Sequence, residues 1–128
     1  MKKITLSEVF KNQPNELWEI LSDLSRCDWV PGVERIKLEG NVREFEMTGM
    51  GKVKEKILEC DSKNMILKYS AIETVAKLNH HLACMEIEAL EQGSLFKWST
   101  EIDPEIFAPN IEESMKISLE SIKSILSE

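Results

Sequence analysis

The chain has 128 residues, of which 42% are hydrophobic and 30% charged, and its net charge is −7. This length and this balance are typical of one globular domain and exclude a disordered chain, so we expect a single domain over residues 1–128. The acidic charge disfavours nucleic acid, which is bound by clustered Lys and Arg, and equally disfavours an anionic membrane surface.

The first quarter of the chain predicts one strand followed by two helical pieces. Residues 3–10 alternate apolar and polar side chains with a period of two, which is typical of a strand. Pro14 suits the first turn of a helix, and apolar residues at helical spacing extend that helix over residues 14–23. Residues 25–29 predict a second short helix, which is ended by a Pro-Gly pair.

The middle of the chain contains six short runs separated by turn residues such as Gly, Asn and Asp. Short runs joined by tight turns predict an antiparallel meander. The six predicted strands cover residues 33–39, 42–48, 52–60, 65–72, 78–90 and 94–102.

The last quarter of the chain predicts one long helix. Apolar residues recur there every three or four positions, which places them in a single stripe. We expect the helix to begin near Pro109, with Asn110 as its cap and with Glu112 and Glu113 in its first turn, where the helix dipole favours anions. The stripe consists of Ile111, Met115, Leu119, Ile122 and Leu126.

The order of these elements indicates the fold class. Helices that are separate from a run of antiparallel strands are typical of α+β proteins. A sheet with one packed face and one wet face needs a large element on the packed face, and the C-terminal helix is the candidate of sufficient length. We therefore expect an antiparallel sheet whose packed face is covered by this helix.

Two phrases near the start of the chain carry a family resemblance. Residues 14–23 are PNELWEILSD, and residues 29–33 are WVPGV. They resemble the opening "P-x-x-V-W-x-x-L-x-D … W-x-P-G-V" of the START-like (SRPBCC) superfamily, and within it of the polyketide cyclase/dehydrase-type proteins. Residues 53–57 with Asp61, followed by residues 67–69, are similar to the central hairpin of that family.

The resemblance implies a helix-grip fold, in which a seven-stranded antiparallel sheet curls around the C-terminal helix. It also implies that the space between sheet and helix takes a lipid, sterol, quinone, polyketide or plant hormone. A minority of members cyclise or dehydrate aromatic polyketides. The matching phrases are largely scaffold, so the resemblance does not choose among these functions.

The alternation within each strand predicts which side chains face the interior, because alternate residues share a face. The projected interior is apolar with a few polar groups, which is the usual composition of a ligand pocket. Ser114, Ser118 and Ser121 lie beside the helical stripe and are small enough to leave volume for a ligand. The predicted ligand-binding residues are Trp29, Arg43, Phe45, Glu55, Leu67, Tyr69, His81, Met85, Phe96, Trp98, Thr100, Met115, Ser118 and Leu119.

Several of these residues also have a purely structural interpretation. His81 suits a hydrogen-bonded core histidine as well as a ligand contact or a catalytic base. A one-residue bulge would turn Glu55 to solvent, whereas inside the fold it must pair with Arg43 or His81 or remain protonated. Tyr69 and the tryptophans of the set can serve the core without any ligand, and Trp29 is also a candidate for the cavity mouth.

Three functions stay open at this point. The first is a carrier or sensor of a small hydrophobic molecule. The second is a cyclase- or dehydratase-like enzyme in which Glu55 or His81 acts as base and Tyr69 or Arg43 donates to an enolate. The third is a protein-interaction module, which predicts an exposed apolar patch. Because the polar residues form no complete catalytic set, binding is favoured over catalysis.

We expect no metal and no cofactor. His80 and His81 are adjacent in a strand and point to opposite faces, and no Cys or carboxylate stands at a ligand spacing. The distant Cys27, Cys60 and Cys84 indicate reduced thiols, packed as small apolar side chains, although any one is a candidate reactive thiol. No apolar run suits a signal peptide or a membrane span, and together with the reduced thiols this predicts a cytoplasmic protein. A monomer and a homodimer both stay open.

Overall fold

The computed structural model describes residues 1–127. Its strands are β1 (Lys2–Phe10), β2 (Lys37–Glu39), β3 (Val42–Met47), β4 (Gly51–Asp61), β5 (Ile66–Glu73), β6 (His80–Leu90) and β7 (Gly93–Asp103). Its helices are α1 (Pro14–Ser22), the short 3-10 helix η1 (Glu105–Phe107) and α2 (Ala108–Leu126).

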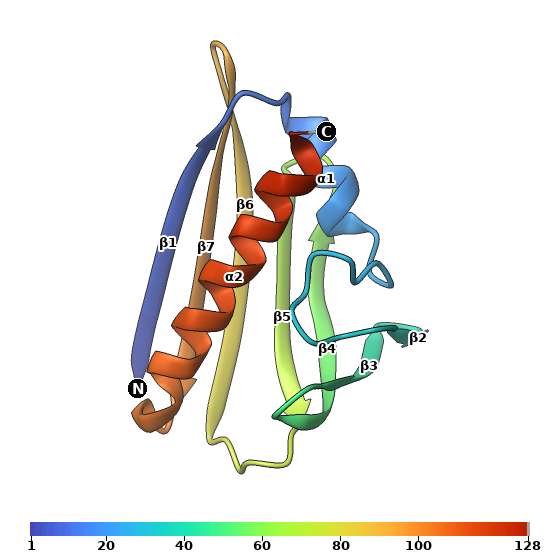
Figure 1. The fold of residues 1–128 in the computed structure, drawn as a ribbon, viewed down its shortest axis with the longest axis vertical. Coiled ribbons are helices and arrows are strands. Elements are labelled where there is room, and N and C mark those ends of the chain that lie inside the picture. The colour runs from blue at the N-terminus through green and yellow to red at the C-terminus, as the bar shows by residue number, and fades with distance from the viewer. Residues whose placement is uncertain (128) are drawn as a thin grey trace.

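The seven strands form one antiparallel sheet in the order β1-β7-β6-β5-β4-β3-β2. Helix α2 crosses one face of this sheet diagonally, from the start of β1 towards α1 (Figure 1). The predicted α+β class and the seven-stranded sheet around a long C-terminal helix are therefore confirmed. The two faces differ as expected, because buried residues alternate with exposed ones along most strands.

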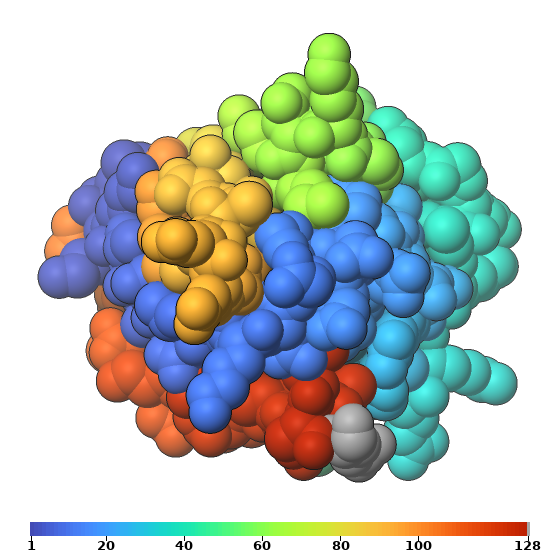
Figure 2. All heavy atoms as spheres, turned by 90° about the horizontal axis from the view of Figure 1, so that it is seen from above, coloured from blue at the N-terminus to red at the C-terminus, as the bar shows by residue number. Residues whose placement is uncertain are grey.

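Helix α1 closes one end of the space between the sheet and α2. Its apolar residues Leu17 and Leu21 are fully buried, and the indole nitrogen of Trp18 donates to Ser62 Oγ in the β4–β5 turn at 3.2 Å. Seen from this end, α1 lies between the β4–β5 turn, the β6–β7 hairpin and the last turn of α2 (Figure 2). Asn12, just before α1, donates its side-chain amide to the carbonyl oxygen of Leu126. The α1 end of the molecule thus contacts the β4–β5 turn, the β6–β7 hairpin and the last turn of α2.

The start of α2 differs in detail from the prediction. The helix begins at Ala108, close to the expected Pro109, but Phe107 rather than Asn110 is the residue that precedes it. No acidic residue lies in its first turn. The reason is that η1 runs directly into α2, and the Ala108 N–H donates to the carbonyl oxygen of Glu105. The backbone therefore satisfies this helix start without a side-chain cap.

The prediction of a second short helix over residues 25–29 is wrong. In its place, two hydrogen-bonded turns run from Asp23 to Arg26 and from Cys27 to Val30, each closed by a backbone bond of 3.0 Å. The Asp23 carboxylate also accepts from the backbone N–H and the hydroxyl of Ser25. Such local side-chain bonds offer the backbone an alternative to a helix, which explains why this segment forms turns.

The predicted strand over residues 33–39 is also shorter than expected, because only Lys37–Glu39 pairs with a neighbour, β3. The residues before it form a loop that is fixed by the backbone N–H of Thr48, which donates to the carbonyl oxygen of Gly32 at 3.0 Å. Gly32 has a φ of +72°, and a Cβ at this position would lie 3.2 Å from Thr48. The loop therefore approaches the end of β3 where glycine fits best.

Candidate ligand cavity

A cavity of about 410 Å³ lies between the sheet and the first half of α2. Small-molecule sites in proteins typically measure roughly 300–1,000 Å³, so this cavity is at the lower end of that range. Its walls come from β3 to β7, from the loop before β2 and from α2. The space predicted from the resemblance is thus present, with a modest volume.

The cavity opens at the end of the molecule opposite α1. Its rim includes Met50 in the β3–β4 turn and Val75 in the β5–β6 loop, and both side chains are exposed. Phe107 and Asn110, at the start of α2, complete the rim. Figure 1 shows the β5–β6 loop at the bottom of the molecule and α1 at the top. A ligand therefore has an entrance lined by loops and a closed end below α1.

Most of the predicted ligand-binding residues lie on the cavity wall. They come from five strands, from the loop after α1 and from α2, so residues far apart in the sequence meet there. The wall includes Trp29, Arg43, Phe45, Glu55, Tyr69, His81, Trp98, Thr100, Met115 and Ser118.

Four predicted residues do not reach the cavity and belong to the packed core instead. Leu67, Met85 and Phe96 are at most 1% exposed, and Leu119 packs with them. Their side chains point to the same side of their strand or helix as those of the wall residues, but they lie nearer to α1. There the side chains of α1, such as Leu17, fill the space between sheet and helix. The expectation that these four residues contact a ligand is not supported.

Arg43 and Glu55 form a buried ion pair on the cavity wall. They stand directly opposite each other on β3 and β4, and Arg43 Nε lies 2.8 Å from Glu55 Oε1. Their side chains are 5% and 12% exposed. The β4–β5 register shifts beside Glu55, yet the side chain stays inside with one of the two predicted partners. Burial raises the pKa of Glu55, and the adjacent Arg43 guanidinium opposes that rise.

Tyr69 lies beside this pair and keeps its proton. The guanidinium carbon of Arg43 lies 4.7 Å from the centre of the Tyr69 ring, a cation–π contact. Burial raises the pKa of the Tyr69 hydroxyl, and the nearby Glu55 carboxylate raises it further. At neutral pH, Tyr69 therefore presents a phenol O–H to the cavity.

His81 is neutral, and its proton is assigned by its backbone contact. The Ala71 N–H donates to His81 Nδ1 at 2.9 Å, so Nδ1 accepts and Nε2 carries the proton. Burial lowers the pKa of His81 to about 4. His80 lies on the opposite face, as predicted, and pairs with Glu101 at 3.0 Å. His81 thus serves as a hydrogen-bond donor at neutral pH, and Glu55 is the better candidate for a base.

Two tryptophans on the wall have unsatisfied indole nitrogens. Trp29 and Trp98 contact each other edge to face, with ring centres 6.2 Å apart and planes at 70°. They are 4% and 5% exposed, and neither Nε1 has a hydrogen-bond partner in the described part of the chain. The Trp98 indole lies near enough to the Tyr69 hydroxyl to lower the pKa of that hydroxyl slightly, but the two groups do not reach hydrogen-bonding geometry.

Some wall residues are absent from the predicted set. Val53 and Ala71 line the cavity and share the inward phase of their strands, so the alternation that selects Phe45 and Tyr69 also selects them. The loop residues had no such signal, because alternation does not extend beyond a strand. This second group comprises Val30, Gly49, Met50, Thr74, Val75, Ala76 and Phe107. Leu78 stands in the outward phase of the predicted strand 78–90, but β6 begins at His80, so Leu78 lies in the loop before it.

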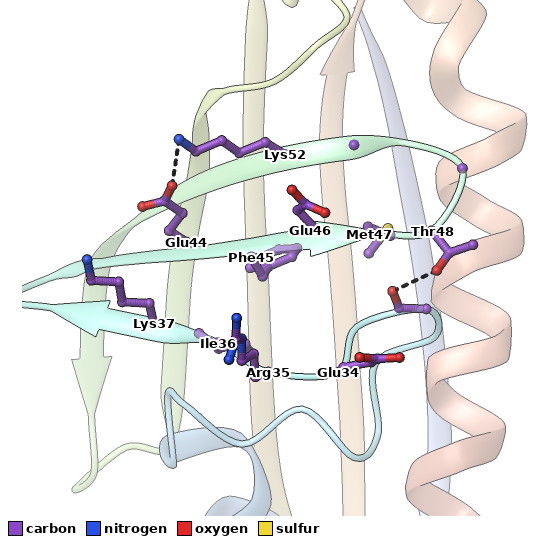
Figure 3. Close-up of a pocket in the computed structure, with 13 residues that line it drawn as sticks. Glu34, Arg35, Ile36, Lys37, Glu44, Phe45, Glu46, Met47, Thr48 and Lys52 are labelled. Carbon is purple, nitrogen blue, oxygen red and sulfur yellow. Dashed lines mark hydrogen bonds and ion pairs between the residues drawn. The ribbon is translucent and has the colours of Figure 1, made fainter.

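A second hollow is an open groove on the edge of the sheet, with a volume of about 1,270 Å³. Figure 3 shows it between the loop before β2 and the β3–β4 hairpin. Its rim is charged, and Lys52 Nζ pairs with Glu44 Oε1 at 2.7 Å. Glu34, Arg35 and Lys37 are exposed along it. Because charged side chains line much of this groove, whereas apolar side chains line most of the cavity beside α2, that cavity is the better candidate for a ligand site.

The cysteines do not take part in the cavity. Cys27 and Cys84 are partly buried, whereas Cys60 is exposed, so the expectation of packed thiols is wrong for Cys60. Partial loss of hydration raises the pKa of the Cys60 and Cys84 thiols, which disfavours the reactive thiolate. In residues 1–127, no three His, Cys, Asp or Glu side chains gather as a metal site would require.

The comparison with protein families identifies the chain. It matches the polyketide cyclase/dehydrase and lipid transport family over residues 1–125. The chain belongs to this family. The predicted resemblance is therefore confirmed at the family level. Among curated protein sequences, none is significantly similar to this chain. No helix in the described part of this family member is long and apolar enough to cross a membrane.

Solved structures share the fold of this polyketide cyclase/dehydrase family member. A protein from Bacillus thuringiensis has a TM-score of 0.87 at 17% identity, over 99% of this chain and 100% of that one. XoxI from Bacillus cereus has a TM-score of 0.79 at 19% identity, with 98% of both chains covered. Norcoclaurine synthase from Thalictrum flavum has a TM-score of 0.79 at 20% identity, over 99% of this chain and 87% of that one. These likenesses show the helix-grip fold.

Proposed function

We propose that this protein binds a small hydrophobic molecule, such as a lipid, a quinone or a polyketide-like compound, in the cavity between the sheet and α2. The observation that carries the proposal is the composition of the wall. Apolar side chains such as Phe45, Val53 and Met115 supply most of it, and a few polar groups such as Thr100 and Ser118 interrupt it. Apolar walls bind by burial, and sparse polar groups orient the ligand.

The cavity volume limits the size of the ligand. About 410 Å³ accommodates two or three fused rings or a medium-length acyl chain, and it is too small for a whole phospholipid. The exposed apolar side chains of Met50 and Val75 at the mouth suit the entry of such a molecule. The family's association with lipid transport and polyketides agrees with this class of ligand.

Native mass spectrometry and thermal unfolding, with a panel of decanoic acid, anthraquinone and 2-acetylnaphthalene, test this proposal. A ligand at a hundred times its dissociation constant should raise the unfolding temperature by about 5–10 °C. The Ser118→Leu variant fills the cavity and should lose this response. Ser121→Leu, on the same helix but outside the cavity, should keep it. A panel without any response, or an equal response in both variants, would contradict the proposal.

A second candidate function is catalysis of proton transfer next to a carbonyl group. It is favoured by one observation, namely that Glu55, Tyr69 and His81 all line the same cavity. The raised pKa of Glu55 suits a general base, while the Tyr69 hydroxyl and the His81 Nε2–H would donate to the enolate oxygen. Norcoclaurine synthase, which shares this fold, has been solved in complex with two aromatic molecules, dopamine and hydroxybenzaldehyde.

Solvent exchange tests that second function. In deuterium oxide, Glu55 would remove a proton from the methyl carbon of 2-acetylnaphthalene and return a deuteron. Proton NMR should show loss of the methyl signal faster than in buffer alone, and Glu55→Gln should abolish the acceleration. If the ketone binds and its methyl signal persists at the buffer rate, the protein is a binder without this activity.

A further inference from the structure

Among the polar groups of the cavity, the indole N–H groups of two tryptophans have no partner in the described residues. An indole N–H can donate a hydrogen bond and cannot accept one. Trp29 and Trp98 are more than nine-tenths buried, line the cavity and leave this donor unpaired within residues 1–127. Buried polar groups in folded proteins are nearly always paired, so two unpaired donors on rings that pack edge to face require an explanation.

Trp18 provides the internal contrast. It is buried to a similar extent, but its indole nitrogen donates to Ser62 Oγ at 3.2 Å, and it does not line the cavity. The fold therefore satisfies the indole donor at the closed end and leaves unsatisfied the indole donors of two residues that line the cavity. Unpaired polar groups that cluster in a cavity are a feature of sites that a ligand completes.

Two further groups at the cavity can donate a hydrogen bond. His81 Nδ1 is occupied by the Ala71 N–H, which leaves the Nε2–H for the cavity. Tyr69 keeps its hydroxyl proton because it is buried beside Glu55. Among the charged groups on the wall, Arg43 and Glu55 neutralise each other at 2.8 Å. An incoming anion would meet the Glu55 carboxylate in a poorly solvated space, so an uncharged acceptor is favoured.

We propose that the ligand carries an uncharged carbonyl oxygen, as in an aryl ketone, an ester or a quinone, and that this oxygen accepts hydrogen bonds from the Trp29–Trp98 pair. The inference rests on the proposed binding function and names the chemistry of its ligand. Both indole nitrogens are closed to water in the empty cavity, so binding includes a shift of one or both rings. The apolar wall holds the hydrocarbon part of the ligand.

Three ligands of matched shape separate the effect of a neutral carbonyl from that of the hydrocarbon and from that of a negative charge. 2-Acetylnaphthalene carries a neutral carbonyl, 2-isopropylnaphthalene has the same size without an acceptor, and 2-naphthoate replaces the ketone by an anion. Calorimetric titration should show that the ketone binds about tenfold or more tightly than the hydrocarbon, because it pairs donors that are otherwise unsatisfied. The naphthoate should bind more weakly than the ketone.

Substitution of each tryptophan by phenylalanine keeps an aromatic ring and removes the N–H. Trp29→Phe and Trp98→Phe should reduce the ketone's preference over the hydrocarbon, by about tenfold for the residue that donates directly. Trp18→Phe removes the same atoms outside the cavity and should leave the preference unchanged. Without ligand, Trp18→Phe should lower the unfolding temperature more than the other two, because only Trp18 loses a hydrogen bond.

The outcomes distinguish this inference from the function on which it rests. If the ketone and the hydrocarbon bind equally well, binding stands and the carbonyl inference is overturned. If 2-naphthoate binds most tightly, the site recognises an anion and the inference is likewise overturned. If neither these compounds nor the wider hydrophobic panel binds, the proposed function itself fails. The ligand series in the unmodified protein remains decisive even if a tryptophan variant does not fold.

Discussion

The two ends of the space between the sheet and α2 differ although the same strands and the same helix form both. At the α1 end, Leu67, Met85 and Phe96 are at most 1% exposed and pack against Leu17. At the other end, the same strands carry Tyr69, Ala83, Trp98 and Thr100, and a cavity of about 410 Å³ remains. One end is a packed core, and the other has the features of a site.

What covers each end explains the difference. Helix α1 brings four buried apolar side chains to the closed end. The open end is covered by the turns and the loop that precede β2, which contribute Trp29, Val30 and Ile36. There the β5–β6 pairing also ends, at Tyr69 and Ala83, and an N–H of β5 further towards the open end, that of Ala71, bonds to the His81 side chain. A wall made of loops and a partly unpaired sheet leaves volume that a helix would fill.

The largest effect should separate the two ends by core truncation. Phe96→Ala removes a ring at the packed end that contacts Phe10 and Trp98, and it should cost about 3–5 kcal/mol of unfolding free energy. Phe45→Ala at the cavity should cost about 1–2 kcal/mol less, because empty space already adjoins that ring. Urea denaturation at pH 7 measures both, and equal losses would mean that the cavity is filled in solution.

The next largest effect should come from the ion pair at the open end. Arg43→Met leaves the Glu55 carboxylate buried without its cation and should cost about 3–4 kcal/mol at pH 7. The cost should diminish as the pH falls towards the ordinary pKa of Glu, 4.5, because Glu55 then binds a proton and no buried charge is left unpaired.

The exposed pair of Lys97 and Glu88 is the matched control for this prediction. Its atoms lie 2.7 Å apart, as close as the buried pair, but its side chains are 44% and 47% exposed. Lys97→Met should therefore change stability little. Comparable losses for Arg43→Met and Lys97→Met in chemical denaturation would show that the Arg43–Glu55 pair is solvated.

The sequence predicts which side chains face inward more reliably than which of them meet empty space. Period-two alternation correctly places Phe45, Tyr69 and Trp98 on one face, but it places Phe96 and Met85 there equally. Alternation describes the two faces of a strand and carries no information about the position of α1 along it. Distinguishing wall from core requires the tertiary arrangement.

Of the polar contacts in the site, one was predictable from the sequence and another was not. The pairing of Glu55 with Arg43 follows from their cross-strand register, which the turn between β3 and β4 sets. The occupied Nδ1 of His81 was not predictable, since it depends on where β5 separates from β6. The turns over residues 23–30 were missed because side-chain bonds of Asp23 compete with helix formation, which apolar spacing does not reveal.

A smaller effect should appear in the pH dependence of the open end. Burial lowers the pKa of His81 from 6.5 to about 4, so the folded protein disfavours its protonation. The stability associated with neutral His81 is fully present above pH 6.5 and is lost as the pH falls to about 4. Each pKa unit corresponds to about 1.4 kcal/mol, and partial exposure reduces the total to roughly 2–3 kcal/mol.

His81→Asn tests this contribution, because the Asn oxygen can replace Nδ1 as the acceptor for the Ala71 N–H and does not titrate. Chemical denaturation between pH 7 and pH 4 should show a shallower loss of stability in the variant. His80→Asn changes the exposed neighbour on the opposite face and should keep the steeper profile of the unmodified protein. Parallel profiles for the unmodified protein and His81→Asn would show that His81 is solvated.

The smallest expected effect is the most selective for the difference between the two ends. Ser118 and Ser94 are both almost fully buried, but Ser118 borders the cavity, whereas Ser94 lies in the packed region and donates to the carbonyl oxygen of Asn12 at 3.0 Å. Ser118→Leu should change the free energy of unfolding by less than about 1 kcal/mol, because the added side chain enters empty space. Ser94→Leu should be strongly destabilising, since overpacking and a lost hydrogen bond act together. If thermal unfolding shows equal losses for the two variants, the space beside Ser118 is not available to a ligand.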